Sequence, residues 1–220
     1  MNKARDDIFD SIRASLRRTG PLDSSVAAAL EQRITARPSH PRPQVAENLV
    51  ETFARKVQEV GGTIAKVSGL GEVPGAVRQH LVAHSLPSQL VASRDPVLEH
   101  IDWPEALTLD VRAALGTDVV AVTGALAAVA ETGTLIMVSG RDTPTTLRLL
   151  PDDHIVVITA DQIVTHLEDG WAEVRRNFEK MPRTVNMITG PSKTADVEQT
   201  LQIGAHGPRR LHVILVLQRD

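Results

Sequence analysis

Cysteine is absent from the 220-residue sequence, and so is tyrosine. Without cysteine the chain can form no disulfide, has no thiolate nucleophile and cannot by itself hold an iron–sulfur cluster or a cysteine-ligated zinc ion. Three phenylalanines and two tryptophans are the whole aromatic complement, so base-stacking platforms for single-stranded nucleic acid are not expected. Any redox centre that the protein uses must therefore belong to another molecule.

Long apolar runs and a strong net charge are also missing. No stretch has the roughly 20 apolar residues that a membrane-spanning helix needs, and the charged N-terminus is unlike a secretory signal. The formal net charge is only −3, with acids and bases mixed along the chain, so no overall field favours nucleic acid or an anionic membrane. The sequence thus predicts a cytoplasmic protein with no membrane span and no nucleic-acid partner, in which any anion site is local.

The N-terminal part of the chain differs in composition from the rest. Apolar residues recur there at helical spacing and predict an amphipathic first helix whose stripe needs a partner surface: Ile8, Phe9, Ile12 and Leu16. Residues 19–44 are interrupted by proline, with a short helix expected over residues 26–34. We therefore expect an N-terminal helix and proline-rich arm over residues 1–44, and one globular domain over residues 45–220.

Helix-like and strand-like segments alternate along the globular domain. Strands are expected over residues 62–67, 89–93, 119–123, 134–138, 154–158, 184–189 and 211–217. Helices are expected over residues 45–60, 73–84, 160–180 and 194–203, the third broken or bent at Gly170. A repeating β-α-β order predicts an α/β fold, namely an open, mostly parallel sheet flanked by helices.

In such a sheet, ligands bind beyond the carboxyl ends of the strands, where loops and helix N-termini converge. Glu131, Thr132 and Gly133 connect two apolar segments, and a carboxylate at that position can act as a base or nucleophile if it is desolvated. Arg141 follows the next strand and is expected at the same mouth. The ordinary alternative is that Glu131 is the polar end of a turn and that Arg141 pairs with its neighbouring aspartate.

Two later loops also contain groups that bind anions. Gly190, Ser192, Lys193 and Thr194 lie where a strand end meets an expected helix start, and can hold phosphate or carboxylate, although the spacing of a Walker A loop is missing. His206, Arg209 and Arg210 precede the last strand, and arginine grips planar oxyanions with paired hydrogen bonds. These loops are equally compatible with a capped helix and solvated charges, and Arg209 and Arg210 face away from the crevice if they lie at the amino end of their strand.

Several other kinds of site lack their required residues. His80 and His84 share one face of an expected helix, but the glutamate of H-E-x-x-H is missing and no metal site is assigned. Neither a G-x-S-x-G elbow nor a G-x-G-x-x-G loop after a strand is present, so serine hydrolase and dinucleotide-binding functions lack their motifs.

Taken together and in order, four segments resemble the LUD domain of the LutC/YkgG family of lactate-utilisation proteins. They are residues 130–135 (AETGTL), 149–151 (LLP), 188–198 (ITGPSKTADVE) and 207–213 (GPRRLHV), within a resemblance that covers about residues 45–217. The last two segments are the specific part. The resemblance implies a fold like that of the NagB/RpiA/CoA-transferase superfamily, in which Glu131 is similar in setting to the glutamate that CoA-transferases place at a strand end.

The resemblance also implies a function. It points to a subunit that binds no cofactor itself and acts with LutA-like and LutB-like partners, whose iron–sulfur clusters serve the oxidation of L-lactate to pyruvate. Its crevice is expected to bind a small carboxylate or a phosphorylated ligand. Two alternatives stay open: a free-standing transferase, isomerase or cyclo-ligase-like enzyme of the same superfold, and a purely structural subunit. Self-association into a homo-oligomer is also left open.

Overall fold

The structure is a computed structural model that describes residues 3–18, 20–36, 41–194 and 202–218. The chain forms two compact units, residues 1–42 and residues 43–220. The first unit contains helices α1 (Lys3–Ser15) and α2 (Ser24–Ala36), at the places where the apolar spacing predicts them, and every described side chain in it is exposed. Among the described residues, no helix has both the length and the apolar character to cross a bilayer.

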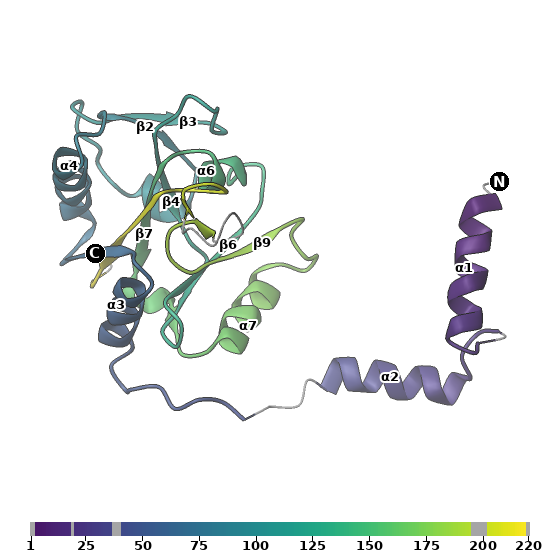
Figure 1. The fold of residues 1–220 in the computed structure, drawn as a ribbon. Helices are drawn as coiled ribbons and strands as arrows, with labels where there is room; N and C mark the ends of the chain where they lie inside the picture. The colour runs from purple at the N-terminus through teal and green to yellow at the C-terminus, as the bar shows by residue number, and fades with distance from the viewer. Residues whose placement is uncertain (1–2, 19, 37–40, 195–201, 219–220) are drawn as a thin grey trace. The chain divides into compact units, whose positions relative to one another are not determined.

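The second unit is built on a six-stranded sheet whose neighbouring strands all pair in parallel (Figure 1). Across the sheet the strands are β1 (Thr63–Val67), β12 (Arg210–Val216), β7 (Asp153–Thr159), β4 (Val120–Gly124), β2 (Gln89–Ala92) and β3 (Thr108–Val111). Every residue of β4 and β7 is buried, whereas the edge strands β1 and β3 consist mainly of exposed and half-buried residues. The mostly parallel α/β sheet expected from the sequence is therefore confirmed, with near-continuous apolar runs in its central strands.

The last strand lies inside the sheet. β12 pairs with β1 on one side, where Thr63 lies opposite His212, and with β7 on the other, where Asp153 lies opposite Arg210. Since side chains alternate along a strand, Ile214 and Val216 enter one core while Val213 and Leu215 enter another. All six strands run the same way, so the starts of β7 and β12 mark one edge of the sheet and the ends of β2 and β4 mark the opposite edge.

Helices cover both faces of this sheet. On one face, α4 (Val73–Ala83) and α5 (Pro96–Glu99) pack with residues from β4, β7 and β12. On the other face, α3 (Leu49–Glu59) buries Phe53 and Val57 against β7 and β12. α3 begins at Asn48, whose side chain accepts a hydrogen bond from Glu51 N and so caps the helix.

A second sheet, which the sequence analysis did not anticipate, shares the α3 face. Its order is β8 (Ile163–Val164), β5 (Ala127–Val129), β6 (Thr134–Val138) and β9 (Val185–Ile188), and β6 pairs antiparallel with both β5 and β9. Small buried residues, Ala127 and Ala128, let it lie close to its neighbours. α7 (Leu167–Asn177) covers it through Val174.

Two helix predictions need correction. The helix expected over residues 160–180 begins only at Leu167, because a 3₁₀ turn (Ala160–Gln162) and β8 come first and His166 with Asp169 forms a capping box. Gly170 does not break α7, which continues through it to Asn177. It is a buried helical residue, and a Cβ there would come within 2.1 Å of Ile136 Cδ1. The glycine therefore permits close approach of the helix to the sheet.

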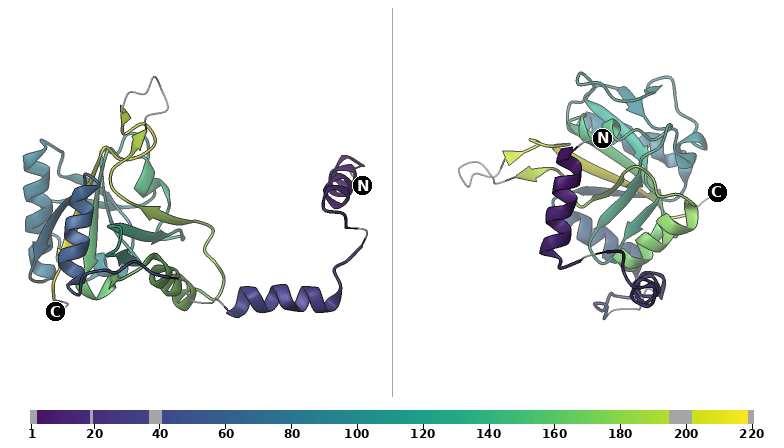
Figure 2. Two further views of the ribbon diagram at one scale, coloured as in Figure 1. Left: turned by 60° about the horizontal axis from the view of Figure 1, so that its bottom comes forward. Right: turned by 90° about the vertical axis from the view of Figure 1, so that its right-hand side faces the viewer.

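The helix expected over residues 194–203 is also wrong where the structure describes it. β10 (Lys193–Thr194) and β11 (Gln202–Ile203) pair antiparallel as a short ladder (Figure 2), while residues 195–201 lie outside the described residues. The ladder takes up backbone groups that a helix would have bonded internally. A left-handed glycine precedes it at Gly190 and another follows it at Gly204, with φ values of +83° and +82°.

Helical glycines offer a direct test of the packing. Gly170→Ala is expected to cost about 1 to 3 kcal/mol, since the new methyl overlaps buried Ile136. Gly75→Ala in α4 is the matched control, because nothing lies within 4 Å of its added Cβ. That change is expected to stabilise the protein by up to about 1 kcal/mol through helix propensity. Urea unfolding measures both, and equal effects of the two substitutions would contradict the packing described.

A buried histidine makes stability depend on pH. His154 on β7 is fully buried and shares a hydrogen bond of 2.8 Å between its Nε2 and Thr123 Oγ1, while its Nδ1 has no partner. Burial, assisted by the positive charge of Arg148, lowers the pKa of His154 to about 3. In the unfolded chain the pKa is about 6.5. The unfolded state therefore takes up the proton first as the pH falls.

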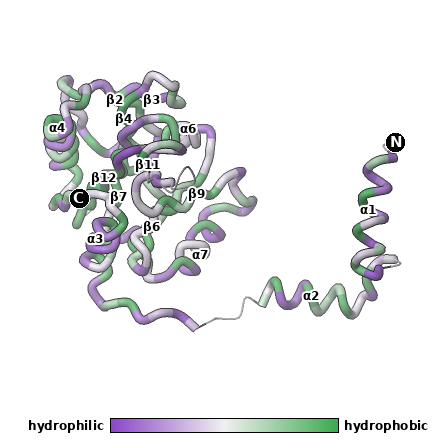
Figure 3. Tube along the Cα trace, in the orientation of Figure 1, coloured by the Kyte–Doolittle hydropathy of each residue, from purple (hydrophilic) through white to green (hydrophobic). Residues whose placement is uncertain are grey.

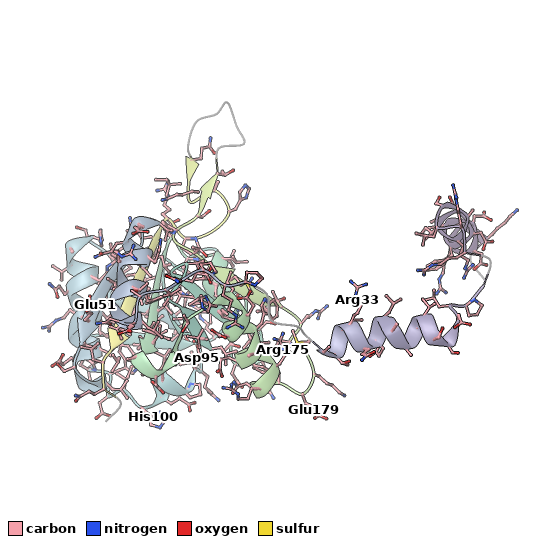
Figure 4. All side chains as sticks on the ribbon, turned by 90° about the horizontal axis from the view of Figure 1, so that it is seen from below. Arg33, Glu51, Asp95, His100, Arg175 and Glu179 are labelled. Carbon is pink, nitrogen blue, oxygen red and sulfur yellow. The ribbon has the colours of Figure 1, made fainter. Side chains whose placement is uncertain are left out.

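We expect the free energy of unfolding to fall by about 1.4 kcal/mol per pH unit between pH 6.5 and 4.5 through His154. Urea titrations at pH 7.5, 6.5, 5.5 and 4.5 measure this slope. The double variant His154→Leu, Thr123→Val removes both bonded side chains and should lose this part of the slope. The exposed His100, labelled in Figure 4, supplies the control His100→Asn, which should retain it. A wild-type curve that is flat below pH 6.5 would show that His154 is protonated in the folded protein.

Candidate functional site

A cavity of about 610 Å³ lies where the two sheets approach each other, at the carboxyl ends of β2 and β4. Its walls come from the loop after β2, the end of β4, the end of β6, the loop to α6 (Thr146–Leu149), the 3₁₀ turn and the last residues of α7. Its volume is in the range of sites that bind small molecules and cofactors. This is the edge at which open α/β sheets bind ligands.

Asp95 fixes the inner wall. It precedes α5 but does not cap that helix; its carboxylate instead accepts a hydrogen bond of 2.8 Å from Gly124 N at the end of β4 and another from Ser93 Oγ. A Cβ on Gly124 would lie 2.9 Å from Asp95 Cβ, so only glycine allows this approach. The loop after β2 is thereby tied to the neighbouring strand, and Asp95 is labelled in Figure 4.

Arg148 is the most deeply buried charge of the wall, with 3% of its surface exposed. Its guanidinium donates to three neutral oxygens: Val138 O at 2.5 Å, Asn186 Oδ1 at 3.1 Å and Thr143 O at 3.4 Å. Burial lowers the pKa of Arg148, while the negative charge of Asp95 opposes that shift. Arginine stays protonated under such conditions, so the cavity has a fixed positive charge in its wall.

Further charges of both signs line the cavity. Arg94 and Arg176 add two guanidinium groups, and Asp161 and Glu173 add two carboxylates. Arg176 Nη1 donates to Glu173 Oε1 at 2.5 Å on the exposed side of α7, whereas the Arg94 side chain is exposed at the end of β2. Backbone bonding places Arg94 beside the loop after β6, since Arg94 N donates to Asp142 O at 2.9 Å. The set can hold a carboxylate or phosphate between guanidinium groups.

Arg141 is the predicted site residue nearest to this cavity in the chain. Its neighbour Gly140 lines the cavity, as do Ser139 and Thr143, and the Arg141 side chain is exposed. The predicted site thus has one residue in a loop that forms the cavity wall.

The turn at residues 131–133 lies against α3. Glu131 Oε2 is 3.1 Å from His166 Nδ1, and the Glu131 side chain is 21% exposed. Thr132 Oγ1 bonds Thr134 Oγ1 at 2.7 Å. Gly133 has a φ of +71°, and a Cβ there would lie 2.7 Å from the carbonyl carbon of Lys56 in α3. The glycine therefore serves helix packing, and the proposed catalytic role of Glu131 stays a prediction.

The loop at residues 190–194 meets the end of the same helix. A Cβ on Gly190 would lie 2.8 Å from Val60 O, and Lys193 Nζ donates to that carbonyl at 2.8 Å. A lysine here satisfies a free carbonyl at the helix C-terminus and suits its dipole. Ser192 N donates to Pro208 O at 2.9 Å, and Thr194 pairs with Gln202 in the β10–β11 ladder. Thr134 Oγ1 lies 2.7 Å from Thr189 Oγ1, so this loop and the turn at 131–133 are neighbours.

The third predicted loop lies at the amino edge of the six-stranded sheet. His206 N donates to Ser192 Oγ at 3.3 Å, and the Arg209 side chain lies over Gly204. Arg210 is the first residue of β12, and its Nε donates at 2.5 Å to Asp153 Oδ2 at the start of β7. The alternative in which these arginines face away from the carboxyl-end crevice is the observed one. The structure thus brings together the three glycine-bearing turns, at residues 131–133, 190–194 and 204–210. None of them lines the cavity.

Asp153 is the centre of a buried cluster at that amino edge. His80 Nε2 lies 2.9 Å from Asp153 Oδ1, and the His80 ring stacks on His212 with centroids 4.1 Å apart. Burial alone raises the pKa of Asp153, but hydrogen bonds from His80 and Arg210 outweigh it and hold the pKa below its ordinary value. Burial also lowers the pKa of His212 to about 4. Stacked rings cannot direct their nitrogens at one ion, and within the described parts of the chain no group of three or more acidic or histidine side chains fits a metal.

Three residues of the cavity wall, Arg94, Asp95 and Arg148, were not among the site residues predicted from the sequence. Arg94 and Asp95 directly follow an expected strand. Because ligands bind beyond the carboxyl ends of the strands in open α/β sheets, both residues could have been predicted. Arg148 immediately precedes the Leu149-Leu150-Pro151 segment, and no feature of the sequence there points to a buried charge. Only the packing of two sheets, one of them unexpected, shows that it is buried.

Comparisons with known proteins agree with this fold. The family model for the LUD domain matches residues 49–216. The chain is 30% identical to Lactate utilization protein C of Deinococcus radiodurans over 190 residues, covering 80% of this chain and 83% of that protein. It is 27% identical to Lactate utilization protein C of Geobacillus thermodenitrificans, covering 67% and 70%. The crystal structure of a DUF162 family protein from Deinococcus radiodurans has a TM-score of 0.56 at 25% identity, covering 79% of this chain and 99% of that chain. The chain therefore belongs to the LUD domain family.

Proposed function

We propose that this chain acts in lactate utilization as a cluster-free subunit, which binds a small anionic ligand and works with iron–sulfur proteins that oxidise L-lactate to pyruvate. The observation that carries the proposal is the arginine-lined cavity at the carboxyl edge of the sheet, in a chain whose relatives are named Lactate utilization protein C. Glu131 and the glycine-bearing turns are not required for this form of the proposal.

The charges of the cavity support an anion as the ligand. Arg148 uses neutral oxygens as its partners, and the arginines at positions 94 and 148 line the same wall as Asp95. The Asp95 carboxylate is already bonded by Gly124 N and Ser93 Oγ. A guanidinium that is not neutralised by a bonded carboxylate attracts a ligand carboxylate or phosphate.

The size of the cavity bears on the ligand class. About 610 Å³ is in the middle of the range for drug-sized ligands and cofactors, and is well beyond the needs of a three-carbon acid. A phosphorylated ligand fills this space better than lactate alone. The proposal includes both small carboxylates and phosphorylated ligands. A binding measurement with each class distinguishes between them.

The absence of cysteine supports a system in which this chain binds the ligand and other proteins carry the iron–sulfur clusters. Oxidation of lactate to pyruvate releases two electrons and two protons, and the electrons need an acceptor. A chain of 220 residues without cysteine cannot supply cysteine-ligated clusters as that acceptor. Iron–sulfur clusters on LutA-like and LutB-like partners would supply that acceptor, and the role of this chain is to bind and position a ligand.

Binding tests the cavity directly. Calorimetry with lactate, pyruvate and inorganic phosphate should detect a ligand that binds the wild-type chain and at least tenfold more weakly the Arg94→Ala variant. A lost charge-assisted hydrogen bond costs about 1.5 to 3 kcal/mol. Arg78→Ala removes the same charge from α4, outside the cavity, and should bind like the wild type. Equal affinity of all three proteins for every probe, or no binding of any probe, would contradict an anion site in the cavity.

Reconstitution tests the division of labour. The chain, mixed with purified iron–sulfur LutA-like and LutB-like proteins, should support lactate-dependent reduction of an electron-accepting dye, and the chain alone should not. The Arg94→Ala variant should assemble normally but lower the rate of the mixture. Turnover of an acyl-CoA, a sugar phosphate or a formylated folate by the isolated chain would instead identify a free-standing enzyme.

A further inference from the structure

Charged and apolar residues line different parts of the cavity. The charged part surrounds the loop at residues 139–143, which follows β6. Arg94 N donates to Asp142 O at 2.9 Å. The Arg148 guanidinium donates to Thr143 O at 3.4 Å, so both arginines adjoin this loop, and both line the cavity. An anionic group that enters the cavity is therefore attracted toward the loop.

The apolar part of the lining comes from the small sheet and α7. Leu126 precedes β5, Val164 ends β8 and Phe178 follows α7, and all three are half-buried residues of the cavity lining. They pack against a cluster of four buried side chains, Ala127, Val129, Ile136 and Val174. Figure 3 shows hydrophobic and hydrophilic residues interleaved along α7, whose apolar side meets this cluster. Leu126, Val164 and Phe178 therefore each have one side fixed in the core and another side in the cavity.

The charged residues of α7 that line the cavity are paired with each other. Arg176 Nη1 donates to Glu173 Oε1 at 2.5 Å, and the Arg176 side chain is 70% exposed. This pair carries no net charge, and it lies in the last turn of the helix, just before Phe178. An anionic group is therefore favoured beside the loop at residues 139–143, whereas the end of α7 favours a neutral, apolar group.

We propose that the ligand of this cavity is an amphiphilic anion, with its carboxylate or phosphate beside Arg94 and Arg148. Its apolar body, a ring or an acyl chain, lies against Leu126, Val164 and Phe178. This ligand class rests on the proposed function, which assigns the anion site to the cavity. Lactate and pyruvate have no such apolar body, so the proposal selects the larger of the ligands that the proposed function includes.

The size of the cavity agrees with such a ligand. Its volume is about 610 Å³, and a three-carbon acid beside the arginines would leave the apolar part of the lining in contact with water. Covering that surface with an apolar body is favourable, because apolar surface is removed from water. A ligand that has both groups thus gains binding energy from both parts of the lining.

Calorimetry on the full chain with two matched pairs of probes tests the apolar body. The pairs are lactate with 3-phenyllactate, and inorganic phosphate with phenyl phosphate. Burial of a phenyl ring strengthens binding by roughly ten- to a hundredfold. In the pair whose anionic group the site accepts, the phenyl member should therefore bind more tightly by about tenfold or more. Arg94→Ala should weaken the binding of both members of that pair.

Two valines supply matched variants. Val164→Thr exchanges a methyl group for a hydroxyl in the apolar part of the lining, and should weaken binding of the phenyl member about fourfold. Val111→Thr makes the same exchange on β3, where Val111 is 49% exposed outside the cavity, and should bind like the wild type. Phe178→Ala should remove most of the advantage that the ring gives, and Phe178→Leu should keep most of it. Circular dichroism of each variant checks that the fold persists.

The outcomes separate this ligand class from the proposed function. Equal affinity for both members of a pair, with binding that still depends on Arg94, would overturn the amphiphilic ligand and leave the anion site intact. Equal effects of Val164→Thr and Val111→Thr would overturn it as well. If none of the four probes binds the wild-type chain, the anion site of the proposed function fails, and the ligand class fails with it.

Discussion

The position of β12 between β1 and β7 is the constraint on which the rest of the domain depends. Until β12 is in place, β1 has no neighbour within the sheet and β7 has only β4. Its alternating side chains also contribute to the cores on both faces, under α4 and under α3. The pairing of Arg210 with Asp153 at the start of these strands fixes their register through a buried carboxylate that burial alone would make costly. The direction shared by the six strands then determines which edge can hold a ligand.

The cavity follows from that direction and from the second sheet. The carboxyl ends of β2 and β4 form one wall of the cavity. Residues of the small sheet, from β6 and β8, form the other wall. Within the first wall, Asp95 connects the loop after β2 to the end of β4. In the second wall, Arg148 connects the end of β6 to Asn186 on β9. The site is therefore a product of tertiary packing, and its charged groups come from segments that look unremarkable on their own.

The sequence predicted the parallel sheet, the helices α3 and α4 and the amphipathic α1 because each has a strong period or a clear glycine or proline boundary. It did not predict the small sheet, since β5 and β8 have only three and two residues and pair with partners far along the chain. The same limit explains the loops at residues 131–133 and 190–194. Their glycines look like ligand-binding glycines, but Gly133 and Gly190 allow backbone contact with α3, which only the fold shows. Arg94 and Asp95 could have been predicted because they follow the carboxyl end of a strand. The burial of Arg148 could not, because it depends on the packing of the second sheet.

Because the cavity is bounded by two different sheets, its width depends on how closely they pack. Gly170 allows α7 to pack closely against Ile136. The small side chains of Ala127 and Ala128 allow the second sheet to pack closely against its neighbours. A bulkier residue at any of these positions would shift a whole wall without altering a single lining side chain. The volume of the cavity is therefore determined by residues in the interior as well as by the residues that line it.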